Sequence, residues 1–257
     1  MLADLLDRFV DLGINLLAAL IGAGAAVLVG VWRRRRRTSD VRRFWGAPRH
    51  PLTFLLPIWD RTPDGWRSAG ILGTGDVRAL LALQRTMGAL RRGFEVKEAP
   101  TLRDASSAPA LVLIGGPRAN TWSASILEEL GGQVLYSFAP DDGSIIGPGR
   151  RRSGHEMDDE DNGTDAALVL RVENPYYSAG TVYVLAGVSG VGTHAAARLV
   201  TTDVGRLLGR LRQDGVDEGG GFQLLLTVKI VNGTPQEPRC VEAFPLRLPD
   251  RASAPGG

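Results

Sequence analysis

Residues 12–32 form an apolar stretch without a charged side chain, and the arginines Arg33 to Arg37 follow it directly. A helix of about 20 such residues is long enough to cross the ~30 Å hydrocarbon core of a bilayer. Because basic residues beside a span stay in the cytoplasm, this pattern places the N-terminus outside. We therefore expect a single-pass protein of the cell membrane whose C-terminal domain is cytoplasmic. A cleaved signal peptide is the alternative, although the basic cluster then lies on the wrong side of the apolar run.

The apolar stretch and the arginines after it indicate two partners. Within it, small residues recur every four positions, at Ala18, Gly22, Ala26 and Gly30. Small side chains at this spacing let two helices approach closely, so a homodimer could form through this face. The side chains of Arg33, Arg34, Arg35, Arg36 and Arg37 are expected to contact anionic lipid headgroups. Residues 1–11 are interpreted as a short lead-in and 33–50 as a basic linker, with Phe44 and Trp45 at headgroup level.

After residue 50, short strand-like apolar runs alternate with longer helical segments. Strands are expected at 52–59, 94–98, 110–114, 133–138, 167–172, 181–186, 222–231 and 239–244, and helices at 77–90, 121–130 and 194–213. Alternation of this kind is typical of an α/β fold. The pattern therefore predicts a Rossmann-like mixed, mostly parallel sheet with helices on both faces, extended by a late antiparallel hairpin.

Composition and charge limit what the domain can be but do not identify its function. One domain is expected over 51–246, with an exposed flexible loop at 139–165 and a disordered tail at 247–257. The formal net charge is only +2, and much of the basic excess lies beside the apolar stretch. A nucleic-acid partner is therefore not expected. The single cysteine, Cys240, excludes an intramolecular disulfide and suits a reducing compartment.

Three segments share the order strand, glycine loop, helix: 73–76, 115–120 and 187–193. In open α/β sheets, ligands bind beyond the carboxyl ends of the strands. A helix N-terminus there favours phosphate, and glycine lets the ligand approach the backbone. The candidate ligand-binding residues are Gly73, Gly75, Asp76, Gly115, Gly116, Asn120, Gly187, Ser189, Gly190, Gly192 and Thr193. In general terms these loops resemble those of nucleotide-recognising Rossmann-like domains.

The expected function is that of a membrane-anchored sensor or effector that binds a small anionic ligand, a nucleotide or a derivative. Backbone amides would hold the phosphate, and Asn120 or Asp76 the sugar. The segment 187–193 has P-loop spacing, but His194 follows Thr193 and the lysine of that motif is absent, so a P-loop NTPase is not expected. The alternative interpretation of these loops is structural: tight turns at the glycines, and helix caps at Asn120 and Asp76.

Two other functions stay open. A hydrolase could act on a nucleotide or glycosidic bond in the same crevice, with Asp76 as its candidate general base. A membrane scaffold without a small-molecule site would use the glycines only as turns. The sequence requires no cofactor and indicates no metal site, because His50, His155 and His194 are scattered.

Overall fold

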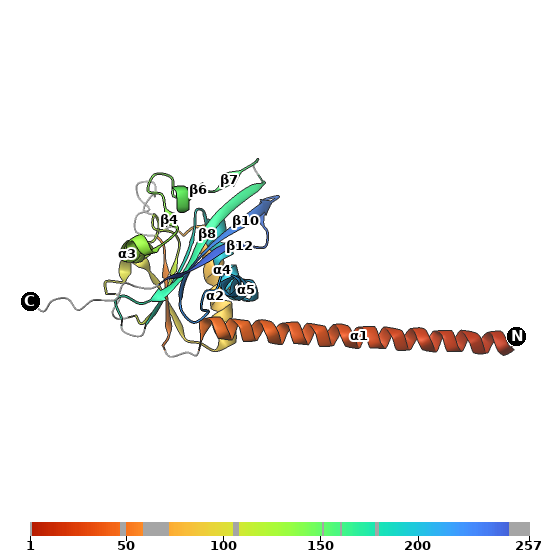
Figure 1. The fold of residues 1–257 in the computed structure, drawn as a ribbon. Coiled ribbons are helices and arrows are strands. Elements are labelled where there is room, and N and C mark those ends of the chain that lie inside the picture. Colours follow the sequence, from red (N-terminus) through yellow and green to blue (C-terminus); the bar gives the residue numbers. More distant parts are fainter. Residues whose placement is uncertain are drawn as a thin grey trace, which may run out of the picture.

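The computed structural model describes residues 2–46, 50–58, 72–104, 108–150, 152–159, 161–177 and 180–246. A strongly curled, nine-stranded mixed sheet forms its centre (Figure 1). The strand order is β11-β10-β8-β9-β3-β1-β2, with β12 also pairing β10 and β7 pairing β8. These strands are β1 (Leu52–Leu56), β2 (Phe94–Glu98), β3 (Ala110–Ile114), β7 (Glu156–Met157), β8 (Gly163–Glu173), β9 (Thr181–Gly187), β10 (Gly221–Val231), β11 (Thr234–Pro235) and β12 (Arg239–Leu246).

Helices cover both faces of the sheet. The α-helices are α1 (Leu2–Trp45), α2 (Thr74–Leu90), α3 (Thr121–Leu130), α4 (Gly190–Thr201) and α5 (Val204–Gln213), and short 3₁₀ turns are η1 (Ala99–Thr101), η3 (Gly131–Gln133) and η4 (Pro148–Arg150). The end of α1 packs with α2, α4 and α5 over one hydrophobic core. On the other face, α3 covers a second core together with a small sheet of β4 (Ser137–Phe138), β5 (Ile145–Ile146) and β6 (Arg152–Ser153).

The expectation of a mixed α/β sheet is confirmed, but the expectation that it is mostly parallel is wrong. Parallel pairing is found for β1 with β2, β1 with β3, and β3 with β9. The pairs β8–β9, β8–β10, β10–β12, β10–β11 and β7–β8 are antiparallel. The connection between β8 and β9 is a short turn around Asn174 and Gly180 rather than a crossover helix. A turn of this length can only join antiparallel strands.

Three smaller expectations also differ from the structure. The helix expected over 194–213 is two helices, because the amides of Thr202 and Asp203 both bond the carbonyl of Arg198 and end α4. Of the strand expected at 133–138, only the last two residues pair. The segment 139–165 is not exposed throughout, since it contributes β5, β6, β7 and the start of β8, and Ile145 is fully buried.

Residues 33–45 continue α1 instead of forming a separate linker. Phe44 and Trp45 are only 1% and 3% exposed, so they lie in the domain core and not at a headgroup level. The Trp45 indole donates to the carbonyl of Val200 at 2.9 Å, and Phe44 lies against Tyr183 with ring centroids 5.7 Å apart. From this attachment, α1 projects far beyond the domain (Figure 1).

Among the residues that the structure describes, no helix combines the length and the apolar character needed to cross a membrane. Within the expected span, the side chains of 12–18 and of Leu20 lie outside the described residues, as do those of Arg33 and Arg34. The expected tail at 247–257 and the end of the strand expected at Trp59 also lie outside them.

Candidate functional site

The three glycine loops line one cavity of about 440 Å³. The carboxyl ends of β3 and β9 lie side by side, because Ile114 pairs with Leu185 and the Gly115 amide bonds the Leu185 carbonyl. The loops that follow these strands therefore meet, and the start of α2 closes the third side. The expected site residues that line the cavity are Gly73, Gly75, Asp76, Gly115, Gly116, Gly187, Ser189, Gly190 and Thr193.

Close packing explains glycine at several of these positions. A Cβ on Gly75 would lie 2.0 Å from the carbonyl oxygen of Gly190, so the first turns of α2 and α4 touch through their backbones. A Cβ on Gly187 would lie 2.2 Å from the Thr193 amide nitrogen. Gly115 has a φ of +93°, which side-chain-bearing residues rarely adopt. The turn interpretation therefore accounts for these glycines without a ligand.

Asn120 is a structural residue and lies behind the cavity wall. Its side chain is fully buried, and its Oδ1 accepts from the amides of Trp122 at 3.1 Å and Ser123 at 3.4 Å, which caps α3. Its Nδ2 donates to the carbonyls of Leu55 at 3.1 Å and Ile114 at 3.0 Å. All four of its hydrogen-bonding positions are thus used within the fold. The capping interpretation describes its place better than sugar binding.

Asp76 lines the cavity and is 4% exposed. It lies in the first turn of α2, whose N-cap is Gly73, so it is not the cap residue that its sequence position suggested. An acidic side chain in a first turn interacts favourably with the helix dipole. Its place on the cavity wall makes Asp76 a candidate ligand contact.

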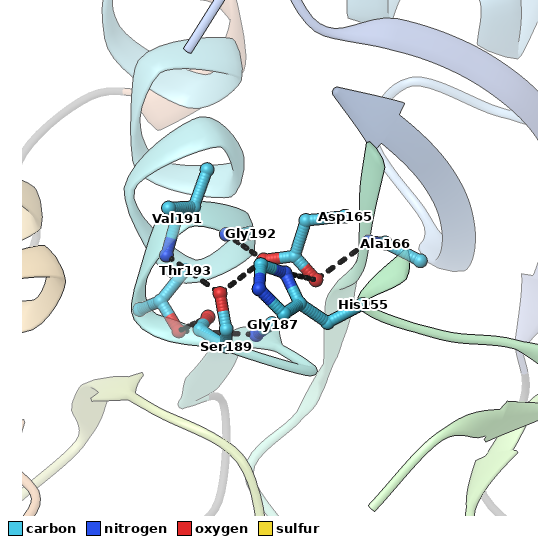
Figure 2. A network of polar contacts seen from close by, with 8 residues as sticks. All are labelled: His155, Asp165, Ala166, Gly187, Ser189, Val191, Gly192 and Thr193. Atoms are coloured by element: carbon cyan, nitrogen blue, oxygen red, sulfur yellow. Dashed lines mark hydrogen bonds and ion pairs between the residues drawn. The ribbon is translucent and has the colours of Figure 1, made fainter. Parts of the chain in front are cut away.

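The carboxylate of Asp165, a buried residue of β8, lies against the first turn of α4 (Figure 2). Its Oδ2 accepts from the Ser189 hydroxyl at 2.5 Å and from the Gly192 amide at 2.6 Å, and its Oδ1 accepts from the Ala166 amide at 2.9 Å. Burial raises the pKa of the Asp165 carboxyl, and the hydrogen bonds from Ser189, Gly192 and Ala166 oppose that rise. Asp165 thus takes the position that an external anion would take at this helix N-terminus.

The rest of the 187–193 loop is similarly used by the fold. The Ser189 Oγ accepts from the Val191 amide at 3.1 Å, which caps α4. The Thr193 hydroxyl accepts from the Gly187 amide at 3.1 Å. Gly192 is buried, and a Cβ there would lie 2.5 Å from the Ala166 carbonyl oxygen. This loop has the sharpest phosphate-binding pattern in the sequence, yet its polar groups bind one another or Asp165.

The sequence reasoning missed Asp165, His155, Arg118 and Phe138. His155 lies with its Nδ1 3.7 Å from the Asp165 Oδ1 (Figure 2). The only available signal for Asp165 was a lone acidic residue at the start of an apolar strand. Arg118, in the loop before α3, and Phe138, on β4, both line the cavity. The guanidinium of the exposed Arg118 donates to the Asp142 carbonyl at 3.1 Å.

The arrangement suits binding better than nucleophilic catalysis. A serine nucleophile requires an adjacent base that takes its proton, most often histidine. Here the Ser189 hydroxyl donates to Asp165, and His155 contacts the other oxygen of that carboxylate. Within the described parts of the chain, no group of three or more His, Cys, Asp or Glu residues could hold a metal ion. The cation of Arg118 and the carboxylate of Asp76 are the charged groups on the cavity wall.

Comparison with known proteins finds no family model and no curated protein that matches this chain.

Proposed function

We propose that the cavity between the glycine loops binds a small anionic ligand that carries a phosphate group, such as a nucleotide or a derivative. The observation that carries the proposal is the position of Arg118 on the same cavity wall as the start of α2. A guanidinium group recognises phosphate by charge and by paired N–H donors. The phosphate would lie between Arg118 and the first turn of α2.

The start of α2 fits this role better than the start of α4. The first intrahelical bond of α2 runs from the Val77 amide to the Gly73 carbonyl, and Gly73 has no side chain to cap the amides before it. The N–H groups of a first helical turn lack acceptors within the helix and attract anions. At α4, by contrast, Asp165 already accepts from the Gly192 amide. The proposed anion position thus moves from the third loop to the first.

Titration of the full chain with inorganic phosphate and with adenosine monophosphate tests this function. Arg118→Gln removes the cation, and we expect it to weaken both affinities roughly tenfold or more, as for the loss of a charged hydrogen bond. Arg85→Gln is the matched control, because Arg85 is exposed on α2 and is not part of the cavity wall. Equal affinities for the wild type and Arg118→Gln would contradict the proposal.

A hydrolase at the same site is the second candidate, because the Asp76 carboxylate is buried and lies on the cavity wall. A carboxylate there could accept the proton of an attacking water. Asp76→Asn should then abolish product formation from a bound nucleotide while its affinity stays within about twofold. Product formed at the wild-type rate would exclude Asp76 as the base.

We propose further that α1 anchors the chain in the cell membrane, with the N-terminus outside and the domain in the cytosol. Ile21, Val27 and Leu28 are 64%, 65% and 71% exposed, and an apolar surface of this kind is unusual on a protein surrounded by water. Arg35, Arg36 and Arg37 would lie at the anionic headgroups. Flotation with vesicles that contain anionic lipid tests the anchor, and cleavage of the domain by protease in inverted but not in right-side-out membrane vesicles tests its orientation.

Self-association through the small residues of α1 accompanies this proposal. A Cβ added to Gly22 or Gly30 would have no heavy atom within 4 Å in the described parts of the chain, so their surface is open to a second helix. Gly22→Leu should abolish crosslinking between copies in the membrane if that face forms the contact.

A further inference from the structure

A second cavity, of about 330 Å³, adjoins the first. Its wall includes Asp142, Ser144, His155, Glu156 and Val188. Val188 also lines the first cavity, and Gly143 of the first lies in the chain between Asp142 and Ser144 of the second. The two cavities therefore share part of their walls and lie next to each other.

Ser144 is the unusual residue of this second cavity. It is 6% exposed, and its hydroxyl has no hydrogen-bond partner among the described residues. Its backbone is held in place, since its amide donates to the Asp142 Oδ1 at 2.8 Å. Burying a hydroxyl without a partner destabilises a fold, because its hydrogen bonds to water are lost without replacement. A buried hydroxyl on a cavity wall is thus a prepared contact for a polar group that enters from outside.

The other polar groups of the cavity define the chemistry of that group. The imidazole of His155 lies beside Asp165, with Nδ1 3.7 Å from the Asp165 Oδ1 (Figure 2). The Glu156 side chain adds a carboxylate to the same wall. Among the described residues, no lysine or arginine lines this cavity as Arg118 lines the first, so its carboxylates disfavour a second phosphate by charge repulsion. They accept hydrogen bonds from hydroxyl groups, and the Ser144 hydroxyl can both donate and accept.

We infer that the second cavity binds the hydroxyl groups of a sugar whose phosphate lies against Arg118 in the first cavity. The inference rests on the proposed function, because it places the two parts of one ligand in adjoining cavities. It selects a sugar phosphate or a nucleoside monophosphate over inorganic phosphate and over ligands with a second phosphate at this end. Ser144, His155 and Glu156 contact the sugar hydroxyls.

The test compares ribose 5-phosphate with inorganic phosphate by calorimetric titration of the full chain in detergent micelles. The wild type is expected to bind ribose 5-phosphate more tightly than inorganic phosphate. Ser144→Ala should weaken the ribose 5-phosphate affinity about three- to tenfold, as for one neutral hydrogen bond, and leave the inorganic phosphate affinity unchanged. Ser125→Ala is the control, because the Ser125 hydroxyl donates to the Thr121 carbonyl on the surface of α3.

The outcomes separate this inference from the proposed function. Binding of inorganic phosphate with the same ribose 5-phosphate affinity in the wild type and Ser144→Ala would overturn the sugar site and leave the phosphate site intact. Binding of neither compound would overturn both. Ser144→Ala should also keep or raise the melting temperature, because it removes a buried hydroxyl without a partner. A clear fall would show that Ser144 is bonded within the fold and would count against the site.

Discussion

The carboxylate of Asp165 accepts a hydrogen bond of 2.6 Å from the backbone amide of Gly192, which lies 27 residues further along the chain. This contact joins the start of β8 to the first turn of α4. It supplies an anion to a helix N-terminus from within the protein. The consequence for the site is direct, because the loop that looked most like a phosphate cradle already holds a carboxylate.

Removal of this carboxylate should destabilise the domain. Asp165→Ala leaves the Gly192 amide, the Ala166 amide and the Ser189 hydroxyl without their acceptor, which should lower the free energy of unfolding by about 2–4 kcal/mol. Urea denaturation of the variant and the wild type measures the difference. Asp158→Ala is the control, since Asp158 is exposed, and it should change stability by less than about 0.5 kcal/mol. An equal effect of both changes would contradict the structural role of Asp165.

Stability should depend on pH through the same residue. Burial raises the pKa of Asp165 above its ordinary value of 3.8, so the folded state keeps a proton that the unfolded state has released. The stability contributed by this group is therefore present below the ordinary pKa and is lost as the pH rises through the raised pKa. We expect the difference in unfolding free energy between the wild type and Asp165→Asn to decrease as the pH rises from the ordinary value of 3.8 through the raised pKa. A difference that grows over this range would show that the pKa of Asp165 is lowered.

Two glycines of α2 should respond in opposite directions to the same substitution. Gly75→Ala places a Cβ 2.0 Å from the Gly190 carbonyl oxygen and should destabilise the fold by about 1–3 kcal/mol. Gly88→Ala meets no atom within 4 Å among the described residues and should stabilise the helix by about 0.5–1 kcal/mol. Melting temperatures of the two variants provide the comparison. A stable Gly75→Ala protein would mean that α2 and α4 are not in backbone contact.

Two aromatic residues of α1 should differ in how much their removal destabilises the domain. Phe44→Ala removes a ring that is 1% exposed and lies 6.3 Å from Phe222, measured between centroids, so we expect a loss of about 3–5 kcal/mol. Trp32→Ala changes a side chain that is 57% exposed and lies beneath the Arg36 guanidinium, and its effect on the stability of the domain should be below about 0.5 kcal/mol. Chemical denaturation followed by far-UV circular dichroism measures both. Similar losses would place Phe44 and Trp32 in equivalent surroundings.

Local patterns predicted some elements well. The apolar run 110–114 and the helix 121–130 have the expected bounds, because a short continuous hydrophobic run and an asparagine cap are signals within a few residues. The strand direction of the second half of the sheet was not predictable in this way. It depends on which strand lies beside β8, and that choice is made by packing between segments far apart in the sequence.

At the candidate site, too, local sequence patterns predict some features and long-range contacts decide the others. The glycines were found because each loop joins a strand to a helix, and the cavity follows from the parallel pairing of β3 with β9. From the sequence alone, Asp165 falls in the segment expected to be an exposed loop, since its partner Ser189 is 24 residues away. The sequence does not distinguish a membrane-surface place for Phe44 and Trp45 from a core place, because aromatic side chains fit both a headgroup layer and a protein core.

The continuity of α1 into the domain core has a mechanical consequence. The indole of Trp45 is bonded to the Val200 carbonyl, and the Arg92 guanidinium donates to the Trp45 carbonyl at 2.7 Å, so the helix end is held on two sides. Its 44 residues extend over roughly 66 Å at 1.5 Å per residue. These contacts tie the orientation of α1 to that of α4, whose first turn lies on the wall of the cavity.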